Sequence, residues 1–341
     1  MSLDSTLKID TRLEGKRISF SQIPVVDIGP LLDGSDSEKV AKEIGHICEN
    51  VGFLYVRNHG IPGQLIEDMY RFTRAFFALP EEEKERLNIV RSGPTLRGDI
   101  PFYGENVDPD KTRDYKEAFD YAAHEEEVSP FFGPNQMPEG LQGVKETMEQ
   151  YLSAMMVLGH KLMSAVALSL DLPQNYFGAL QKKPITIQRL LHYPPQEGEI
   201  SQAEIGIGAH TDYGALTILS QDEVGGLQVQ NHEGEWISAP PLEGCFIVNI
   251  GDLVQTFTND RYISTMHRVI NTSGRERYSV PFFMDLDYDA VVEVVETCKS
   301  KDNPPRYTPY TCGQHKFKRF LDSYAHLSAQ GHRDSGKGEA G

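Results

Sequence analysis

Cysteine is scarce in this chain of 341 residues, and its four cysteines are far apart in the sequence. Cys48, Cys245, Cys298 and Cys312 form no Cys-x-x-Cys pair. This spacing argues against a disulfide framework or a zinc knuckle and favours a reducing compartment. Residues 1–16 also lack the apolar core of a signal peptide. We therefore expect a cytoplasmic protein.

Basic residues are outnumbered by acidic ones. Lys plus Arg is 33 and Asp plus Glu is 50, which gives a net charge of -17. Such a surface repels nucleic-acid phosphates and anionic membranes, so we expect neither as a partner. A long uninterrupted apolar run is also missing. The most apolar stretch, residues 152–172, contains His160, Lys161 and several serines, which predicts a buried helix rather than a membrane span.

The pattern along the chain predicts helices first and a β-rich region second. Residues 91–115 are punctuated by Gly and Pro and are predicted to form a long loop. From residue 184 onward, short apolar runs separated by turn residues predict a β-sandwich or barrel. Residues 330–341 are predicted to be a frayed polar tail. Helices are expected near 36–51, 65–77, 143–170 and 315–327, with a further helix start at 80–83, and strands near 23–28, 53–56, 188–193, 216–219, 227–230, 246–250, 267–270 and 279–284.

A candidate metal site begins with His210 and Asp212 in Gly206-Ile-Gly-Ala-His210-Thr-Asp212-Tyr-Gly214. Residues two apart on a strand share a face, so both side chains are expected to project into the same space. A third ligand would complete a two-His, one-carboxylate face, which suits Fe(II) and leaves adjacent positions for a co-substrate and O2. His267 opens a later strand-like run and can point inward. By itself, such a residue is more often a buried core histidine than a metal ligand.

The His-x-Asp spacing of His210 and Asp212 occurs a second time in the sequence. His332-Arg-Asp334 repeats the spacing in the polar tail, and we assign that copy no role.

Arg277 and Ser279 form a second candidate pair ten residues beyond His267. On a strand their guanidinium and hydroxyl would share one face. The planar guanidinium matches a carboxylate in two-point contact, and the serine adds one hydrogen bond. Together they predict a carboxylate pocket near the metal. The alternative is a surface ion pair between Arg277 and Glu276.

These pieces occur in an order and spacing that resemble the isopenicillin N synthase-like family of 2-oxoglutarate/Fe(II)-dependent dioxygenases. The resemblance covers roughly residues 22–325. It is carried by His210-Thr-Asp-Tyr-Gly, Gly225-Gly-Leu-Gln-Val229, Asn249-Ile-Gly-Asp252, His267-Arg-Val and Arg277-Tyr-Ser279, and in the N-terminal half by Ile23-Pro-Val-Val-Asp-Ile, Gly52-Phe-Leu-Tyr-Val-Arg-Asn-His-Gly60, Phe76-Phe-Ala-Leu-Pro80 and Tyr115-Lys-Glu-Ala-Phe119.

The resemblance implies an α+β fold with a double-stranded β-helix (jelly roll) core flanked by helices. It implies three regions: an N-terminal dioxygenase region at 22–130, the jelly-roll core at 184–290, and a C-terminal helix and polar tail at 291–341. By resemblance, His210, Asp212 and His267 are the iron ligands. Arg277 and Ser279 would hold the distal carboxylate of 2-oxoglutarate. Tyr193 matches a tyrosine that often contacts the co-substrate or substrate carboxylate, and its alternative is a half-buried strand tyrosine.

The implied activity is that of an Fe(II)- and 2-oxoglutarate-dependent dioxygenase. It would oxidise a small organic substrate with O2, by hydroxylation, and release succinate and CO2. Leu191 stands where many members carry Asn, and Arg277-Tyr-Ser-Val-Pro-Phe-Phe283 also resembles isopenicillin N synthase itself. The alternatives are therefore an Fe(II) oxidase that uses no 2-oxoglutarate, uncoupled 2-oxoglutarate breakdown, and a non-catalytic metal-binding barrel. Phe102, Tyr103 and the Arg97-Gly98 loop are the expected substrate contacts.

Overall fold

The computed structural model describes residues 22–108, 112–195 and 204–324. Its helices are α1 (Gly29–Leu32), α2 (Ser37–Asn50), α3 (Gly63–Phe77), α4 (Glu81–Arg86), α5 (Val144–Ser169), α6 (Asp252–Phe257) and α7 (Cys312–Ser323), with 3-10 turns η2 (Ile89–Thr95), η3 (Gly178–Leu180) and η4 (Glu296–Cys298). Its strands are β1 (Val25–Asp27), β2 (Phe53–Arg57), β3 (Gly98–Ile100), β4 (Arg113–Asp114), β5 (Glu117–Tyr121), β6 (Pro184–Tyr193), β7 (Glu204–Ile205), β8 (Ile207–His210), β9 (Leu216–Gln221), β10 (Leu227–Gln230), β11 (Trp236–Ser238), β12 (Cys245–Ile250), β13 (His267–Val269), β14 (Arg277–Asp287), β15 (Val291–Val292) and β16 (Tyr310–Thr311).

Local signals in the sequence explain how helix α2 leads into strand β2. The side chain of Asp36 caps α2 by accepting a hydrogen bond from the Lys39 amide at 3.3 Å. The helix ends at Asn50, and Gly52 follows with a φ of +72°, which is in the region that favours glycine. A Cβ at this position would lie 2.3 Å from the carbonyl oxygen of Ile263, so the close approach also requires glycine. The chain can therefore turn directly into β2, next to the segment that leads to His267.

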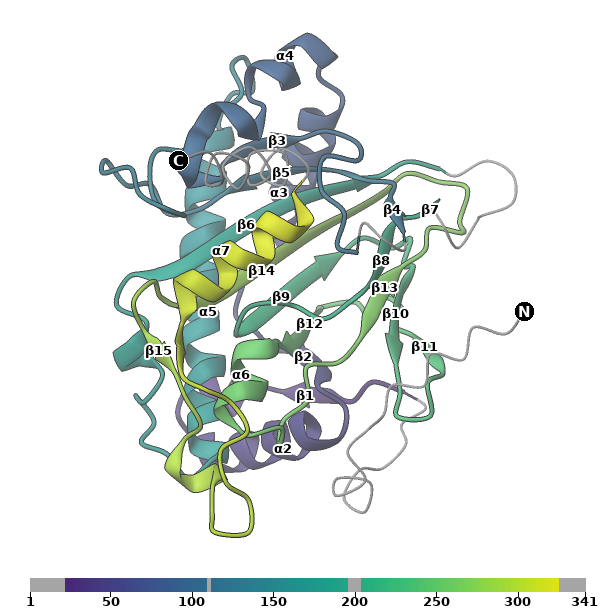
Figure 1. The fold of residues 1–341 in the computed structure, drawn as a ribbon. Coiled ribbons are helices and arrows are strands. Elements are labelled where there is room, and N and C mark those ends of the chain that lie inside the picture. The colour runs from purple at the N-terminus through teal and green to yellow at the C-terminus, as the bar shows by residue number, and fades with distance from the viewer. Residues whose placement is uncertain (1–21, 109–111, 196–203, 325–341) are drawn as a thin grey trace, which may run out of the picture.

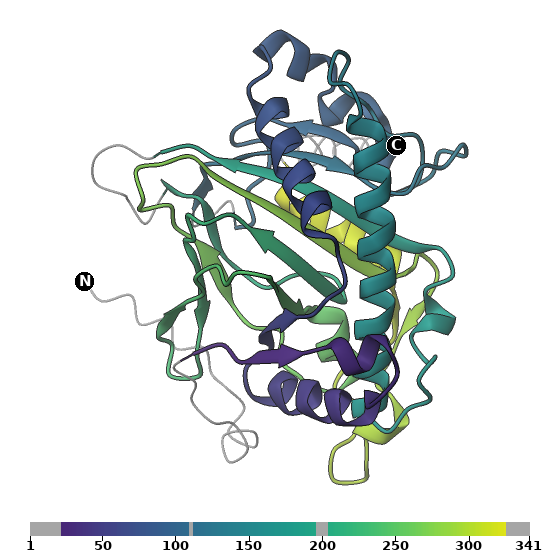
Figure 2. The same ribbon diagram turned by 180° about the vertical axis from the view of Figure 1, so that it is seen from behind.

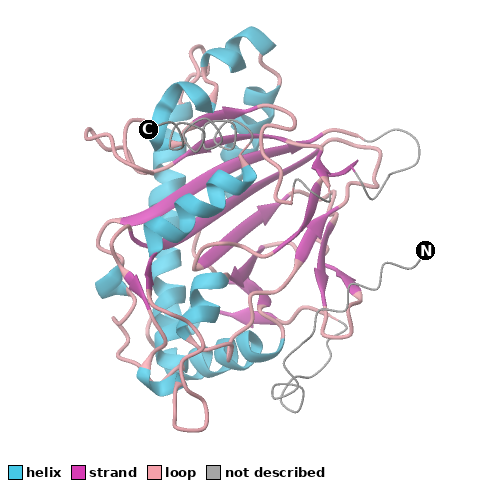
Figure 3. Ribbon diagram, in the orientation of Figure 1, coloured by secondary structure: helices cyan, strands magenta, loops and turns pink. Residues whose placement is uncertain are grey.

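Two sheets form the core of the structure (Figure 1). The larger has the strand order β1-β2-β12-β9-β14-β6-β5-β3, and the smaller has the order β11-β10-β13-β8. Helices α2, α3 and α5 lie together behind the larger sheet, as the reverse view shows (Figure 2), while α7 lies in front of β14 and β6 (Figure 3). The site described below sits between the two sheets. The α+β class and the jelly-roll core that the sequence predicts are confirmed.

Strands from the N-terminal part of the chain extend the larger sheet at both edges. β1 and β2 continue it beyond β12, and β5 and β3 continue it beyond β6. Residues assigned to the 22–130 region and residues assigned to the 184–290 region therefore share one sheet.

The prediction of a long loop over residues 91–115 is wrong in part. This segment contains most of η2, the strand β3, which pairs antiparallel with β5, and the short strand β4, which pairs with β7. Strands of two or three residues are too short for apolar periodicity to reveal, because their partners lie elsewhere in the chain. The other helices and strands expected from periodicity are confirmed. The predicted helix residues beyond Tyr324 and the predicted frayed tail lie outside the described residues.

Helix α5 is the most apolar helix of the described residues. By length and composition it is able to cross a membrane, and 50% of its most apolar 18-residue window is buried inside the protein. Its neighbours are α2, α3, β9 and β14. Residues such as Tyr151, Met155 and Leu162 are buried there, as the sequence predicts for a core helix.

Candidate metal centre and co-substrate pocket

Two histidines meet across neighbouring strands of the smaller sheet. His210 is the last residue of β8, and His267 is the first residue of β13. The two strands are antiparallel, with His210 directly opposite His267. Their ring centroids lie 4.2 Å apart. Strand pairing therefore brings together two side chains that are 57 positions apart in the sequence.

Asp212 reaches the same point from a turn. The prediction that His210 and Asp212 lie on one strand is wrong for Asp212, because β8 ends at His210. The carbonyl of Asp212 accepts a hydrogen bond from the Asp252 amide at 2.9 Å, and that of Gly214 accepts one from Leu253 at 3.1 Å. The start of α6 therefore fixes the turn. The Asp212 carboxylate nevertheless faces both imidazoles, so the predicted convergence is present.

The three side chains present one ligand atom each to a common point. Oδ1 of Asp212 lies 3.7 Å from Nε2 of His210 and 3.6 Å from Nε2 of His267. The three ligand atoms all lie within 4.8 Å of one another. Two imidazole nitrogens and one carboxylate oxygen are the donor set of non-haem Fe(II) sites, so these residues fit Fe(II).

Hydrogen bonds fix the orientation of each ligand. Nδ1 of His210 donates to the Gly208 carbonyl at 2.8 Å, and Nδ1 of His267 donates to the Thr265 carbonyl at 3.1 Å. Both Nε2 lone pairs are therefore directed to the metal position. Oδ2 of Asp212 accepts hydrogen bonds from Thr217 Oγ1 at 2.5 Å and Asn249 Nδ2 at 2.7 Å. These bonds leave Oδ1 as the ligand oxygen.

The ionisation states of the three groups also suit a cation. Burial, together with the neighbouring His210, lowers the pKa of His267 to about 4. Burial likewise lowers the pKa of His210. Burial acts to raise the pKa of Asp212, but the two imidazoles and the hydrogen bonds from Asn249 and Thr217 outweigh it and keep that pKa below its usual value. Neutral imidazoles and an ionised carboxylate are the forms that bind a metal.

Arg277 and Ser279 lie side by side on β14, as predicted. Nη1 of Arg277 donates to Oγ of Ser279 at 3.1 Å, and Nε of Arg277 donates to the Gly225 carbonyl. Both side chains are buried, each with 1% exposure. The surface ion pair with Glu276 does not form, because Glu276 contacts His192 instead. Among the described residues no carboxylate forms an ion pair with Arg277, although its charge acts on that of Asp222. A buried guanidinium therefore lies here without a directly paired carboxylate from the described residues.

Tyr193 stands directly opposite Arg277 in the pairing of β6 with β14. The Arg277 guanidinium lies 4.6 Å from the centre of the Tyr193 ring, a cation–π contact. Tyr193 is fully buried, with 1% exposure, and is not a half-buried strand residue. The Tyr193 ring packs against the guanidinium, and the contact of Tyr193 with a co-substrate stays a prediction.

Two regions of this chain match known families. Residues 23–140 match the family described as non-haem dioxygenase in morphine synthesis, N-terminal, and residues 184–286 match the 2OG-Fe(II) oxygenase superfamily. The chain belongs to the 2OG-Fe(II) oxygenase superfamily. This oxygenase therefore uses Fe(II) and 2-oxoglutarate and acts with O2 on small-molecule substrates.

Whole-length relatives agree with this family. The oxygenase is 35% identical over 332 residues to homoarginine-6-hydroxylase of Glycine max. This alignment covers 90% of this chain and 99% of the relative. It is 34% identical to a 2-oxoglutarate-Fe(II) type oxidoreductase of Emericella nidulans, over 90% of this chain and 91% of the relative. A full-length Neurospora crassa protein, crystallised with alpha-KG and thymine, has a similar structure, with a TM-score of 0.80 and 30% identity over 88% of this chain and 96% of that one.

Several polar residues of the site were given no role by the sequence reasoning. Asn249 was noted only as part of Asn249-Ile-Gly-Asp252, and Thr217, Lys116, Glu105 and Arg189 were not singled out. The available signal was the strand alternation itself, because Arg189 precedes Tyr193 by four positions and so shares its face.

The expected substrate contacts of Phe102, Tyr103 and the Arg97-Gly98 loop stay a prediction, and the structure shows which residues they contact within the chain. Tyr103 lies near the polar residues around Glu105 and donates from its hydroxyl to Glu204 at 3.0 Å, while Phe102 stacks on Tyr115 with ring centroids 5.3 Å apart. Arg97 is buried and donates to the Phe131 carbonyl. Its guanidinium therefore holds the loop together.

Proposed function

We propose that this oxygenase hydroxylates a C–H bond of a small polar metabolite, with His210, Asp212 and His267 as the Fe(II) ligands. The observation that carries the proposal is the convergence of two correctly oriented Nε2 atoms and a single free carboxylate oxygen on one point. In the same proposal, Arg277 and Ser279 bind the distal carboxylate of 2-oxoglutarate.

The residues of this chain would hold and orient the reactants. Bound Fe(II) supplies the oxygen activation that is coupled to conversion of 2-oxoglutarate to succinate and CO2. Asp212 contributes Oδ1 while Thr217 and Asn249 hold its other oxygen. The Arg277 guanidinium neutralises the distal carboxylate of the co-substrate in a buried, water-poor setting, where charge-assisted hydrogen bonds are strong.

An amino acid is the substrate class that we propose. The support is the name of the Glycine max relative, which is a homoarginine-6-hydroxylase aligned over nearly its whole length. The net charge of -17 would also attract a cationic amino acid from a distance. The structural similarity to a protein crystallised with thymine supports a second candidate, a neutral pyrimidine.

Two measurements test the function. Anaerobic mixing of the protein with Fe(II) and 2-oxoglutarate is expected to give a visible charge-transfer band, because 2-oxoglutarate would chelate the bound metal. Succinate release is then measured in air with free amino acids, including L-homoarginine, and with thymine. A substrate-stimulated release supports hydroxylation, and succinate release that no compound stimulates supports uncoupled breakdown. Absence of both the band and the release would sink the proposal and favour a non-catalytic metal-binding barrel.

We also propose that this oxygenase acts in the cytoplasm on free small molecules, without a nucleic-acid or membrane partner. The four cysteines are all unpaired, which suits a reducing compartment. Helix α5 packs against α2, α3 and the larger sheet, which suits a core helix. Cell fractionation tests the proposal, and recovery in a membrane fraction would contradict it.

A further inference from the structure

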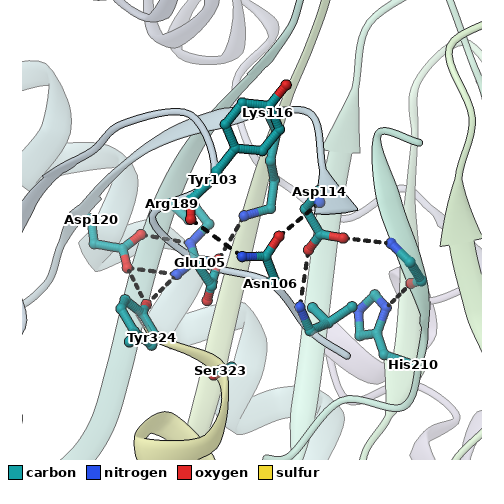
Figure 4. A network of polar contacts seen from close by, with 12 residues as sticks. Tyr103, Glu105, Asn106, Asp114, Lys116, Asp120, Arg189, His210, Ser323 and Tyr324 are labelled. Atoms are coloured by element: carbon teal, nitrogen blue, oxygen red, sulfur yellow. Dashed lines mark hydrogen bonds and ion pairs between the residues drawn. The ribbon is translucent and has the colours of Figure 1, made fainter. Parts of the chain in front are cut away.

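A buried group of four charges lies on the same sheet face as the proposed co-substrate residues. Alternation along β6 places Arg189 on the face of Tyr193, and Asp120 of β5 lies directly opposite Arg189. The same alternation continues from Asp120 back to Lys116, just before β5. The fourth member, Glu105, comes from the preceding loop, and Figure 4 shows Lys116 and Arg189 both pointing at it.

Arg189 is held by several acceptors within this group. Its Nε and Nη2 donate to the two oxygens of Asp120 at 2.7 and 2.8 Å, and its Nη1 donates to Glu105 Oε2 at 2.7 Å. Nη2 also donates to the Tyr324 hydroxyl at 2.7 Å. These contacts join the barrel to the end of α7, so Arg189 already has a structural role.

Lys116 is different, because most of its hydrogen-bonding capacity is unused. Its ammonium has three N–H donors. In the part of the chain that the structure describes, its one acceptor is Glu105 Oε2, at 2.7 Å. The side chain is only 2% exposed. The ammonium is therefore paired with one carboxylate, and its other N–H groups have no acceptor among the described residues. Because buried donors without acceptors are costly, a further acceptor would be favoured at this position.

The Lys116 segment is tied directly to the strand that carries His210. Asp114, two residues before Lys116, accepts a hydrogen bond from the Gly208 amide at 2.9 Å. The carbonyl of Gly208 in turn accepts the hydrogen bond from Nδ1 of His210. These bonds, and the contact of β4 with β8, place the segment before Lys116 beside the strand that carries His210.

We propose that Lys116 is a specificity-determining residue whose ammonium binds the carboxylate of the primary substrate. In this proposal Glu105 holds the ammonium of Lys116 in place. This inference rests on the proposed function and narrows its substrate to a small molecule with a carboxylate. The charges of Glu105, Asp120, Lys116 and Arg189 cancel. The ammonium and carboxylate on the α-carbon of an amino acid together add no net charge to this buried group, whereas the second carboxylate of a dicarboxylic acid adds uncompensated negative charge. A free amino acid is therefore the class that fits best.

The experiment compares carboxylates with matched uncharged compounds. Wild type and Lys116→Met are assayed for succinate release with a panel of free amino acids that includes L-homoarginine, with the carboxamide of each, and with thymine. We expect the wild type to prefer the acids. We expect Lys116→Met to raise the KM for the best acid at least about 10-fold, as for a lost charge-assisted hydrogen bond, and to abolish the preference over its amide. Lys116→Arg is expected to restore part of the preference.

Lys84 provides a matched control. It is also a buried lysine, with 6% side-chain exposure, and is paired with Glu117 at 2.5 Å and Glu81 at 3.1 Å. Glu117 pairs with His192, which lies on the opposite sheet face from Tyr193, away from the metal. Lys84→Met removes the same charge and is expected to lower the melting temperature without changing the preference for acids.

Outcomes that overturn the inference differ from those that overturn the proposed function. The inference about Lys116 is overturned if the wild type releases succinate only with thymine or with the amides, or with none of the acids. It is also overturned by an unchanged KM for the acid in Lys116→Met, or by an equal rise in the KM for the co-substrate, which indicates a general structural role. In all these cases the anaerobic band of wild type with Fe(II) and 2-oxoglutarate persists. Loss of that band in wild type overturns the proposed function instead.

Discussion

Asn249 Nδ2 donates a hydrogen bond to Oδ2 of Asp212 at 2.7 Å, on the side of the carboxylate that faces away from the two imidazoles. Asn249 lies directly opposite Thr217 in the pairing of β12 with β9, and Thr217 donates to the same oxygen. Two adjacent strands of the larger sheet therefore hold a ligand that extends from a turn beside the smaller sheet. This arrangement limits Asp212 to a single metal-binding oxygen.

Replacing Asn249 with Leu is expected to weaken metal binding. The change keeps the side-chain size but removes the donor, so Asp212 is free to rotate or to chelate with both oxygens. Loss of such a supporting partner typically costs about 10–100-fold in metal affinity. Calorimetric titration with Mn(II), an oxygen-stable substitute for Fe(II), measures the effect. Thr217→Ser, which keeps the hydroxyl, is the control and should bind almost as wild type. An unchanged affinity in Asn249→Leu would show that Thr217 alone is sufficient.

Removing a ligand should have a larger effect than removing its support. His210→Ala and Asp212→Ala are each expected to abolish 2-oxoglutarate turnover and the anaerobic charge-transfer band, because two ligands do not hold the metal. Circular dichroism should show that both variants remain folded. His332→Ala, in the second His-x-Asp of the sequence, lies outside the described residues and is expected to leave turnover unchanged. An active His210→Ala protein would count heavily against the metal assignment.

Arg277→Met tests the co-substrate pocket separately from the metal. The buried guanidinium has no carboxylate partner among the described residues, so its loss removes attraction for the co-substrate without leaving another charge unpaired. We expect the 2-oxoglutarate concentration for half-maximal turnover to rise at least about 10-fold. Mn(II) affinity should change little. A parallel loss of both would indicate misfolding, and Ser279→Ala should show a smaller shift in the same direction.

Sequence patterns predicted the metal ligands better than they predicted the surrounding polar groups. Arg277 and Ser279 lie two apart on one strand, as predicted, and the structure also brings His210, Asp212 and His267 together. The strand assignment failed at Asp212, because the turn there depends on hydrogen bonds to α6 that local sequence does not reveal. The contacts of Asn249 with Asp212 and of Lys116 with Glu105 each join a residue on or next to a strand to a residue of a turn or loop. Local sequence patterns do not specify such contacts, because they depend on how separate segments are placed.

Strands of two or three residues could not be predicted from the sequence, for the same reason that contacts between separate segments could not. The long helix α5 and the strand β14 carry enough residues for their periodicity to show. The strand β3 has three residues and exists because β5 pairs with it. Gly98 there has a φ of +124°, and a Cβ would lie 2.1 Å from the Leu87 carbonyl oxygen. Glycine in residues 91–115 therefore marks a close backbone approach as well as a loop.

Asp99, next to Gly98 in β3, should make the stability of the protein depend on pH. Burial raises the pKa of its carboxyl to about 8, Lys84 opposes this change, and nearby glutamates reinforce it. Its Oδ1 has no hydrogen-bond partner among the described residues. Because the folded-state pKa is above the unfolded value, its contribution to stability is fully present below about pH 4 and is lost as the pH rises toward 8.

Asp99→Asn removes the ionisation and is expected to stabilise the protein at pH 8 more than at pH 5.5. The extra stabilisation should reach at most about 3 kcal/mol, measured by urea unfolding at both pH values. A difference between variant and wild type that is the same at pH 5.5 and pH 8 would show that Asp99 is ionised throughout this range.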